Sequence, residues 1–241
     1  MKCLIIAAGQ GSRLRSIAEA KPLIPLKNTP LIERVIDSCL EAGVDGFYVV
    51  VGYKGNSVRE HLEEVSWSKN VPITIIENDE WERANGISVL KAKLHMDEPF
   101  LLMMGDHIFD PEIARLLMLQ SSANEGILLA VDEDLKNPFV DMDDVTRVLV
   151  EENRIQKIGK GMEPYNCFDT GVFLCDPTLF SAIEKSAKEG DDSLSGGVRN
   201  LAKQGKAKAM PINGLFWCDI DDPSNFKQAE EYLSSLAENC A

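Results

Sequence analysis

Residues 1–25, MKCLIIAAGQGSRLRSIAEAKPLIP, indicate the fold class of this chain, because they set an apolar strand before a glycine-bearing loop. The loop carries Gly9 and Gly11. Such a loop presents unpaired backbone N–H groups to a ligand, and Arg13 and Lys21 add positive charge beside them. The stretch therefore predicts a phosphate-binding loop at the end of the first strand.

The first half of the chain alternates between apolar runs and helix-period patterns. The runs predict strands over residues 3–7, 46–51, 71–76 and 100–104, and the patterns predict helices over 30–42, 56–65, 85–96 and 112–120. This alternation is typical of a parallel sheet that helices cover on both faces. We therefore expect an α/β fold with a doubly wound, mostly parallel sheet of the Rossmann-like kind.

The second half has shorter β-rich pieces, which an acidic segment, DEDLKNPFVDMDD, interrupts between residues 125 and 150. Further strands are expected over 154–159, 166–175 and 207–211, and helices over 177–189, 193–203 and 223–236. No repeat or linker divides the sequence. We expect a single domain over residues 1–241, with halves 1–120 and 121–241, the second carrying a small β-rich excursion and a C-terminal helix.

Charge and composition narrow the class of function. The chain has 39 acidic and 25 basic side chains, a formal net charge of −14, so its field repels nucleic acid and anionic membranes. No apolar run approaches the roughly 20 residues of a membrane span. The six cysteines are scattered, without a metal-ligand spacing, and we expect reduced thiols in a cytoplasmic protein. An anionic substrate must then be held by local cations or by a metal.

Two common nucleotide-binding motifs do not fit the first loop. A dinucleotide fingerprint needs a third glycine where Leu14 stands, and an acidic residue after the second strand, which instead ends in VVVGYKG. The Walker-type loop needs a G-K-[ST] sequence that is absent from residues 1–25. The loop therefore belongs to another phosphate-binding class.

The pattern A-A-G-x-G-S-R followed by K-P resembles the signature of nucleotidyltransferases that couple NTPs to phosphorylated sugars and alcohols. The resemblance implies a nucleotidyltransferase fold, and it assigns catalytic roles to Arg13 and Lys21. It also implies that the nucleotide contacts the residues of the strand end and loop, which are Ala7, Ala8, Gly9, Gly11 and Ser12. The two alanines are small enough for a base to approach their backbone.

Two apolar runs that end in carboxylates are further landmarks of this family. FLLMMGDH places Gly105 and Asp106 after the fourth strand, and FWCDIDD carries Asp219 and Asp221. If the second run returns beside the fourth strand, its carboxylates face Asp106 and can hold Mg²⁺ across the nucleotide phosphates. Asp219 and Asp221 point to the same side by strand alternation, and the family pattern favours Asp221 as the direct ligand. Asp222 is the better candidate for a helix cap.

The segments KIGK, FVD and DTG complete a resemblance to the CTP:inositol-1-phosphate cytidylyltransferases. This resemblance implies that Lys160 neutralises the acceptor phosphate, also as a catalytic residue, and that Asp141, Asp169 and Thr170 bind acceptor hydroxyls. Asn78, Asn85 and Ser88 resemble a pattern of cytidylyltransferases of the choline-phosphate type, which implies that they bind the nucleotide, and Gly105 is expected to join them. An alternative for Asn85 and Ser88 is that they only cap the helix that begins there.

The substrates implied are CTP and inositol 1-phosphate, with Mg²⁺ as cofactor and CDP-inositol and pyrophosphate as products. A second interpretation keeps the enzyme class and changes the acceptor to a sugar 1-phosphate or choline phosphate. A third is a non-catalytic nucleotide-binding regulatory module on the same fold. An exposed sheet edge leaves room for a homodimer. No side chain of the sequence selects cytosine over uracil by itself.

Overall fold

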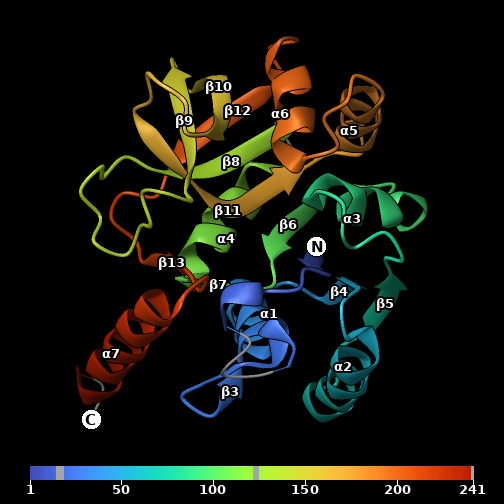
Figure 1. Ribbon diagram of the computed structural model, residues 1–241, viewed down its shortest axis with the longest axis vertical. Helices are drawn as coiled ribbons and strands as arrows, with labels where there is room; N and C mark the ends of the chain where they lie inside the picture. Colours follow the sequence, from blue (N-terminus) through green and yellow to red (C-terminus); the bar gives the residue numbers. More distant parts are fainter. Residues whose placement is uncertain (15–18, 122–124, 240–241) are drawn as a thin grey trace.

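The structure is a computed structural model that describes residues 1–14, 19–121 and 125–239 (Figure 1). Nine strands form one large sheet: β1 (Lys2–Ala7), β4 (Gly46–Val51), β5 (Ile73–Glu77), β6 (Phe100–Met104), β8 (Ile127–Asp132), β9 (Thr146–Glu151), β10 (Arg154–Lys160), β11 (Cys167–Cys175) and β12 (Ala207–Pro211). The helices are α1 (Leu31–Ala42), α2 (Gly55–Lys69), α3 (Asn85–Lys91), α4 (Pro111–Leu119), α5 (Thr178–Lys188), α6 (Leu194–Ala202) and α7 (Pro223–Asn239).

Smaller elements lie outside the large sheet. They are the strand pairs β2 (Pro25–Leu26) with β3 (Thr29–Pro30) and β7 (His107–Phe109) with β13 (Trp217–Asp219), and the 3₁₀ turns η1 (Ser12–Leu14), η2 (Lys21–Leu23) and η3 (Lys93–His95). Both η1 and η2 belong to the N-terminal loop. The loop is therefore folded in its described parts rather than extended.

The large sheet has the order β5-β4-β1-β6-β11-β8-β12-β10-β9, so it runs through both halves of the chain. Strands β5, β4, β1 and β6 are parallel, and β12 is parallel to β8. Strand β11 lies between β6 and β8 and is antiparallel to both. The prediction of a mostly parallel α/β sheet is confirmed.

Helices cover both faces of this sheet, as the doubly wound prediction requires. In β1, Cys3 and Ile5 face a core that α1, α2 and α4 share, whereas Leu4 and Ile6 face a core with α3, α5 and α6. Side chains alternate between the faces of a strand, so a run of continuous apolar residues is buried on both sides. That is why the first strand reads as an unbroken apolar segment.

The carboxylate-bearing run near the C-terminus has a different neighbour from the one expected. Strand β13 does not pair with β6; it pairs antiparallel with β7, with Asp219 opposite His107. The place beside β6 is taken by β11. The chain turns at Gly105 and Asp106 between β6 and β7. Because β13 pairs with β7, this short strand holds β13 beside the cavity.

The helix predicted over residues 85–96 is shorter in the structure and is capped differently. Helix α3 ends at Lys91, and η3 follows it. Its N-cap residue is Ala84, so the prediction that Asn85 caps this helix is wrong. Asp222 does cap α7, because its carboxylate accepts hydrogen bonds from the backbone N–H groups of Ser224 and Asn225.

A third apolar cluster anchors the N-terminal loop. Leu14 and Ile24, from the two ends of the loop, are fully buried against Ile108 of β7 and Ile220 after β13. Residues of α7 close the same cluster. Burying these side chains fixes η2, and with it Lys21, above the short β7–β13 pair.

Within the described residues no helix is both long enough and apolar enough to cross a membrane. The cysteines that the structure describes are free and buried, namely Cys3, Cys39, Cys167, Cys175 and Cys218. Cys240 lies outside the described residues.

Candidate active site

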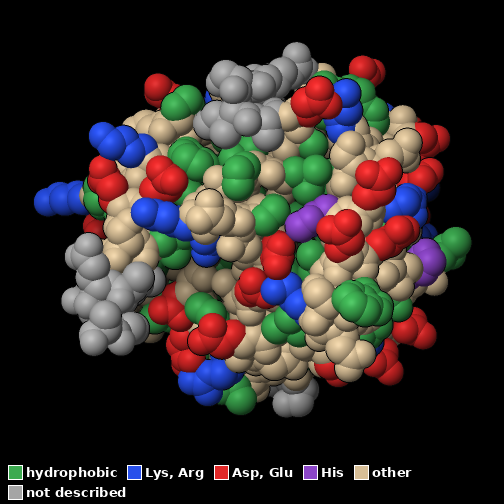
Figure 2. Space-filling model, turned by 90° about the horizontal axis from the view of Figure 1, so that it is seen from below, with side chains coloured by type: hydrophobic (Ala, Val, Ile, Leu, Met, Phe, Trp, Pro, Cys, Tyr) green, Lys and Arg blue, Asp and Glu red, His purple; other side chains and the backbone are tan. Residues whose placement is uncertain are grey.

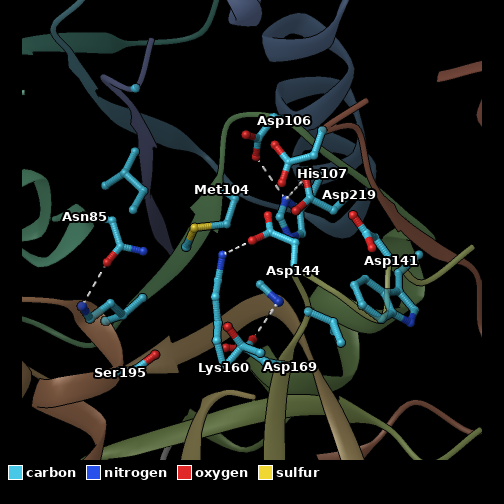
Figure 3. Close-up of a pocket in the computed structure, with 18 of the residues that line it drawn as sticks. Asn85, Met104, Asp106, His107, Asp141, Asp144, Lys160, Asp169, Ser195 and Asp219 are labelled. Atoms are coloured by element: carbon cyan, nitrogen blue, oxygen red, sulfur yellow. Dashed lines mark hydrogen bonds and ion pairs between the residues drawn. The ribbon is translucent and has the colours of Figure 1, made fainter. Parts of the chain in front are cut away.

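A cavity of about 310 Å³ lies where β1 and β6 end. Ala8 and Gly9 line it from the first half of the chain. Lys160 and Asp169 line it from the second half (Figure 3). Ligands of open α/β sheets bind at the carboxyl ends of the strands, because the loops that follow diverge there. The cavity therefore occupies the position that the fold favours for a ligand.

Lys21 joins two of the predicted carboxylates directly. Its Nζ donates a hydrogen bond to Asp106 Oδ2 at 2.6 Å and another to Asp221. Asp219 Oδ1 is 3.9 Å from the same nitrogen. Two oxygens that bond one nitrogen lie within about 6 Å of each other. The structure thus brings together the aspartates of two separate segments, as the sequence predicted.

Burial makes this cluster electrostatically strong. Lys21 is only 6% exposed. Burial by itself lowers the pKa of Lys21, but Asp106, Asp219 and Asp221 outweigh it and raise this pKa. Burial likewise opposes ionisation of Asp106, yet Lys21 and His107 hold the pKa of Asp106 well below its usual range. Both groups are therefore charged near neutral pH.

His107 is a member of the cluster that the sequence analysis did not assign. Its Nδ1 lies 3.0 Å from Asp106 Oδ1 and 3.6 Å from Asp219 Oδ1. Burial lowers the pKa of His107, but Asp219 and Asp106 together raise it to about 9. The imidazole is then a cation near neutral pH. The sequence offered one indication of this role, which is that His107 directly follows Asp106 in MGDH.

Asp219 is the carboxylate of this cluster whose buried oxygen, Oδ1, lacks a hydrogen-bond partner among the described residues. Burial raises the pKa of Asp219 to about 7; His107 and Lys21 oppose this, while Asp106 and Asp221 add to it. In the described part of the chain, Asp106, His107 and Asp219 form the one group whose ligand atoms lie close enough to hold a metal ion, within 4.8 Å of one another.

These oxygens fit a hard divalent cation. Mg²⁺ takes oxygen ligands, one or two of them from protein carboxylates, and keeps the rest for phosphates and water. The buried Asp219 oxygen lies near Asp106 and has no hydrogen-bond partner in the described part of the chain, so it is free to bind such an ion. The residues present therefore fit Mg²⁺ at Asp106 and Asp219, because no described residue bonds the Asp219 oxygen, whereas Lys21 bonds both Asp106 and Asp221.

The two glycines of the signature, Gly9 and Gly11, are required for different structural reasons. Gly11 has a φ of +57°, and a Cβ there would lie 2.4 Å from the Cβ of Lys21, so any larger residue would displace the lysine. Gly9 has open space around its Cα, which leaves its backbone accessible to a ligand in the cavity. Gly105 packs against Ala7, since a Cβ there would come within 2.8 Å of the alanine Cβ.

The predicted nucleotide-binding residues separate into two groups. Ala8, Gly9, Asn85 and Ser88 line the cavity. Ala7, Gly11, Asn78 and Gly105 are not among the lining residues, and Ser12 belongs to η1. The lining therefore receives only part of the predicted set.

Asn78 and Asn85 act as braces between segments. Asn78 is buried; it donates to Ser88 Oγ at 3.0 Å and accepts from the backbone N–H of Glu80. Asn85 accepts from the backbone N–H of Leu194 at 2.9 Å, which ties α3 to the start of α6. With its oxygen used in this way, the amide nitrogen of Asn85 is turned toward the cavity (Figure 3).

The acceptor side of the cavity holds two of the three predicted hydroxyl-binding residues. Asp141 and Asp169 line the cavity. Burial raises the pKa of Asp169 to about 6, opposed by a hydrogen bond from Gly171 and by His107. Thr170 is different: it is fully buried, and its hydroxyl donates to the carbonyl of Ala130 at 2.8 Å. In this structure the hydroxyl is not available to an acceptor.

Asp144, which the sequence analysis did not select, bridges the two halves of the site. Lys160 Nζ is 2.5 Å from Asp144 Oδ1, and Arg13 Nη1 is 3.3 Å from Asp144 Oδ2. Burial raises the pKa of Asp144, but hydrogen bonds, those of Lys160 and Arg13 among them, outweigh it and lower the pKa to about 2. Its position within the acidic segment DEDLKNPFVDMDD gave no signal that separated it from its neighbours.

The charged groups around the cavity thus alternate in sign, although the whole chain is acidic. Figure 2 shows acidic side chains spread over one face of the molecule, with a histidine beside acidic side chains near the middle of that face. Among the described residues, Arg83, His107 and Lys160 are cationic side chains of the lining, and Arg13 and Lys21 bond the lining aspartates Asp144 and Asp106. They are local, which agrees with the inference from net charge.

A strand-end loop with cations, opposed by carboxylates that fit a divalent cation, can hold the phosphates of a nucleotide. Residues 3–203 match the family described as the MobA-like NTP transferase domain. The chain belongs to this family.

Relatives and solved structures extend the match over nearly the whole chain. A bifunctional IPC transferase and DIPP synthase of Rubrobacter xylanophilus is 32% identical over 237 residues, which are 97% of this chain and 52% of that protein. The structure of the inositol-1-phosphate CTP transferase from T. maritima is 30% identical, with a TM-score of 0.84, covering 97% of this chain and 94% of the other.

A UTP–glucose-1-phosphate uridylyltransferase of Haloferax volcanii is 28% identical and covers 97% of this chain and 96% of its own length. The chain spans about half the length of the bifunctional relatives that it matches. The expected resemblance to a nucleotidyltransferase that acts on inositol 1-phosphate is confirmed.

Proposed function

We propose that this chain transfers the cytidylyl group of CTP to inositol 1-phosphate and releases pyrophosphate. The observation that carries the proposal is the placement of cations at both sides of one cavity. From the glycine-loop side, Lys21 and Arg13 bond the lining residues Asp106 and Asp144, and Lys160 lines the cavity from β10. Two phosphate-bearing substrates can therefore be held against each other. The inositol-1-phosphate CTP transferase of T. maritima supports the choice of substrates.

In the proposed reaction a phosphate oxygen of the acceptor attacks the α-phosphorus of CTP. The new P–O bond forms as the bond between the α-phosphorus and the bridging oxygen to the β-phosphorus breaks, so pyrophosphate leaves with the electron pair. The acceptor phosphate loses its second proton near pH 6, so it is mainly a dianion at neutral pH and needs no general base. The protein's task is to offset charge and to orient the two phosphates.

Each cation has a part in this task. Arg13 and Lys21 stabilise the charge that grows on the departing pyrophosphate, together with backbone N–H groups of the loop from Gly9 to Ser12. Lys160 holds the acceptor phosphate. Asp141 and Asp169 accept hydrogen bonds from hydroxyls of the polyol, because both carboxylates line the acceptor side.

Mg²⁺ would be held by Asp106 and Asp219, while Asp221 orients Lys21. This assignment differs from the expectation that Asp221 is the direct ligand, and it is supported by the unpartnered Asp219 oxygen beside Asp106. A bound Mg²⁺ supplies Lewis-acid charge stabilisation to the phosphates. His107 donates to Asp106 and keeps its carboxylate in place.

The test is release of pyrophosphate from CTP with inositol 1-phosphate, in Mg²⁺. A second candidate, a uridylyltransferase for a sugar 1-phosphate, is favoured by the Haloferax volcanii relative, and it predicts turnover with UTP and glucose 1-phosphate instead. Turnover with neither pair, over a broad panel of acceptors, would support a non-catalytic module and contradict both.

The metal assignment has its own test. In Asp106→Asn the Mg²⁺ concentration for half-maximal rate should rise by about tenfold or more, because one charged ligand is lost. Asp97→Asn, an exposed aspartate outside the cavity lining, is the matched control and should keep the parent requirement. An unchanged requirement in Asp106→Asn would move the metal site elsewhere.

A further inference from the structure

The two oxygens of Asp144 contact cations that have separate tasks in the proposed function. Oδ1 bonds Lys160, which holds the acceptor phosphate, and Oδ2 bonds Arg13, which serves the nucleotide phosphates. Figure 3 shows Asp144 in the middle of the cavity, with Lys160 extended toward it. A carboxylate with both oxygens on cations occupies the kind of place that a phosphate needs.

The loop that carries Asp144 is held in position on both sides of this residue. The backbone N–H of Val145 donates to the carbonyl of Asp141 at 2.8 Å. Phe139 packs edge-to-face on Phe216, with ring centroids 5.2 Å apart, and its carbonyl accepts from Asn225. Asp144 is therefore aimed at the two cations by a folded loop.

The two ion pairs are weak enough for a ligand to replace them. The side chains of Arg13 and Lys160 are 50% and 60% exposed, and that of Asp144 is 24% exposed. Because water reaches both cations and part of the carboxylate, the pairs are screened and each contributes little to stability. A phosphate dianion carries more charge than the carboxylate and can displace it.

Displacement links the two substrates, because one carboxylate serves both cations. A phosphate that binds either cation repels the Asp144 carboxylate. When this side chain turns away, both of its oxygens leave their cations together, so the second substrate finds its own cation already released. A protein that pays a rearrangement cost only once shows positive coupling between its two ligands.

We propose that Asp144 is a shared counter-ion whose displacement couples CTP binding to acceptor binding. This inference rests on the proposed function. It makes Asp144 a positioning residue that acts through Arg13 and Lys160. It predicts that each substrate binds more tightly once the other is present.

The experiment measures the dissociation constant of inositol 1-phosphate by calorimetry, with and without a saturating α,β-methylene analogue of CTP, in constant Mg²⁺. The coupling factor is the ratio of the constants without and with the analogue. In Asp144→Asn this factor should fall by about fivefold, the effect of two exposed ion pairs. Each ligand alone should bind that variant more tightly than the parent, by a similar factor.

Asp143→Asn is the matched control. Asp143 is the neighbour of Asp144 in the sequence, and its side chain is exposed, so the substitution removes the same charge without changing Asp144. Its coupling factor should equal that of the parent, and Asp144→Ala should behave as Asp144→Asn. An unchanged factor in Asp144→Asn, weaker binding of either ligand alone, or an equal change in Asp143→Asn would overturn the role of Asp144.

Failure of the proposed function would look different. If inositol 1-phosphate supports no turnover, the acceptor assignment is wrong. The affinity of the CTP analogue alone still tests Asp144, because Arg13 must leave the carboxylate whatever the acceptor is. Equal affinity of the analogue for the parent and for Asp144→Asn would then overturn the inference.

Discussion

The nucleotide side and the acceptor side of the cavity each depend on a lysine, and the two lysines are held in opposite ways. Lys21 is 6% exposed and lies against three aspartates. Lys160 is 60% exposed and bonds one aspartate of a loop. Lys21 is held by burial among carboxylates. Lys160 is the last residue of β10, and its side chain is exposed to solvent.

This difference implies different consequences for substitution. A buried cation that offsets several carboxylates cannot be replaced by water, so its loss affects both the charge balance and the local packing. An exposed cation gives affinity that salt and solvent screen, so its loss weakens binding and leaves the fold intact. The nucleotide side should therefore govern the rate constant, and the acceptor side the Michaelis constant.

The largest effect is expected in Lys21→Met. Loss of a preorganised donor to the phosphates should lower kcat by about a hundredfold or more. Removal of the cation also leaves Asp106 and Asp221 close together without their shared partner, so the free energy of unfolding should fall by roughly 3 kcal/mol. Pyrophosphate release measures the first effect, and urea unfolding followed by circular dichroism measures the second.

Lys2→Met is the control for this substitution, because Lys2 lies at the other end of β1 and its side chain is 47% exposed. It should keep the parent values of both quantities. A Lys21→Met protein with parental kcat would remove the lysine from the chemistry and reverse the comparison between the two sides.

A smaller effect is expected in Lys160→Met. The KM for the acceptor should rise by about tenfold, the loss of a hydrogen bond to a charged group, while unfolding is unchanged. Lys157→Met, an exposed lysine of the same strand that does not line the cavity, is the control. Steady-state kinetics with the acceptor varied at saturating CTP measures the change. A fall in kcat with constant KM would show that Lys160, like Lys21, acts on the rate constant rather than on acceptor binding.

Most of the fold could be predicted from the sequence, because each part of it depends on a local pattern. The apolar run before Gly9 predicted β1 with both faces buried, and the helix-period patterns predicted the helices on either side. The partner of the FWCDIDD run was not predictable in this way. Which strand lies beside β6 depends on long-range packing, and a short strand such as β7 leaves little pattern.

The candidate site was predicted in part for a related reason. Asp106, Asp219 and Asp221 stand at strand ends, where position alone brings side chains to one edge. Asp144 lies in an acidic loop, and nothing local distinguishes it from Asp143. The contacts between Lys21 and the carboxylates also required the structure, since a sequence does not say whether a lysine bonds protein or ligand.

The smallest effect on activity is expected in Thr170→Val, where the sequence analysis placed an acceptor-binding hydroxyl. Asp169 and Gly171 line the cavity, and because side chains alternate along a strand, Thr170 points away from it. The KM for the acceptor should stay within about twofold of the parent value, because the hydroxyl bonds Ala130 instead. The lost hydrogen bond leaves a buried carbonyl unsatisfied, so the free energy of unfolding should fall by about 1–2 kcal/mol. Asp169→Asn is the matched comparison and should raise the KM; a larger rise in Thr170→Val would return the hydroxyl to the acceptor site.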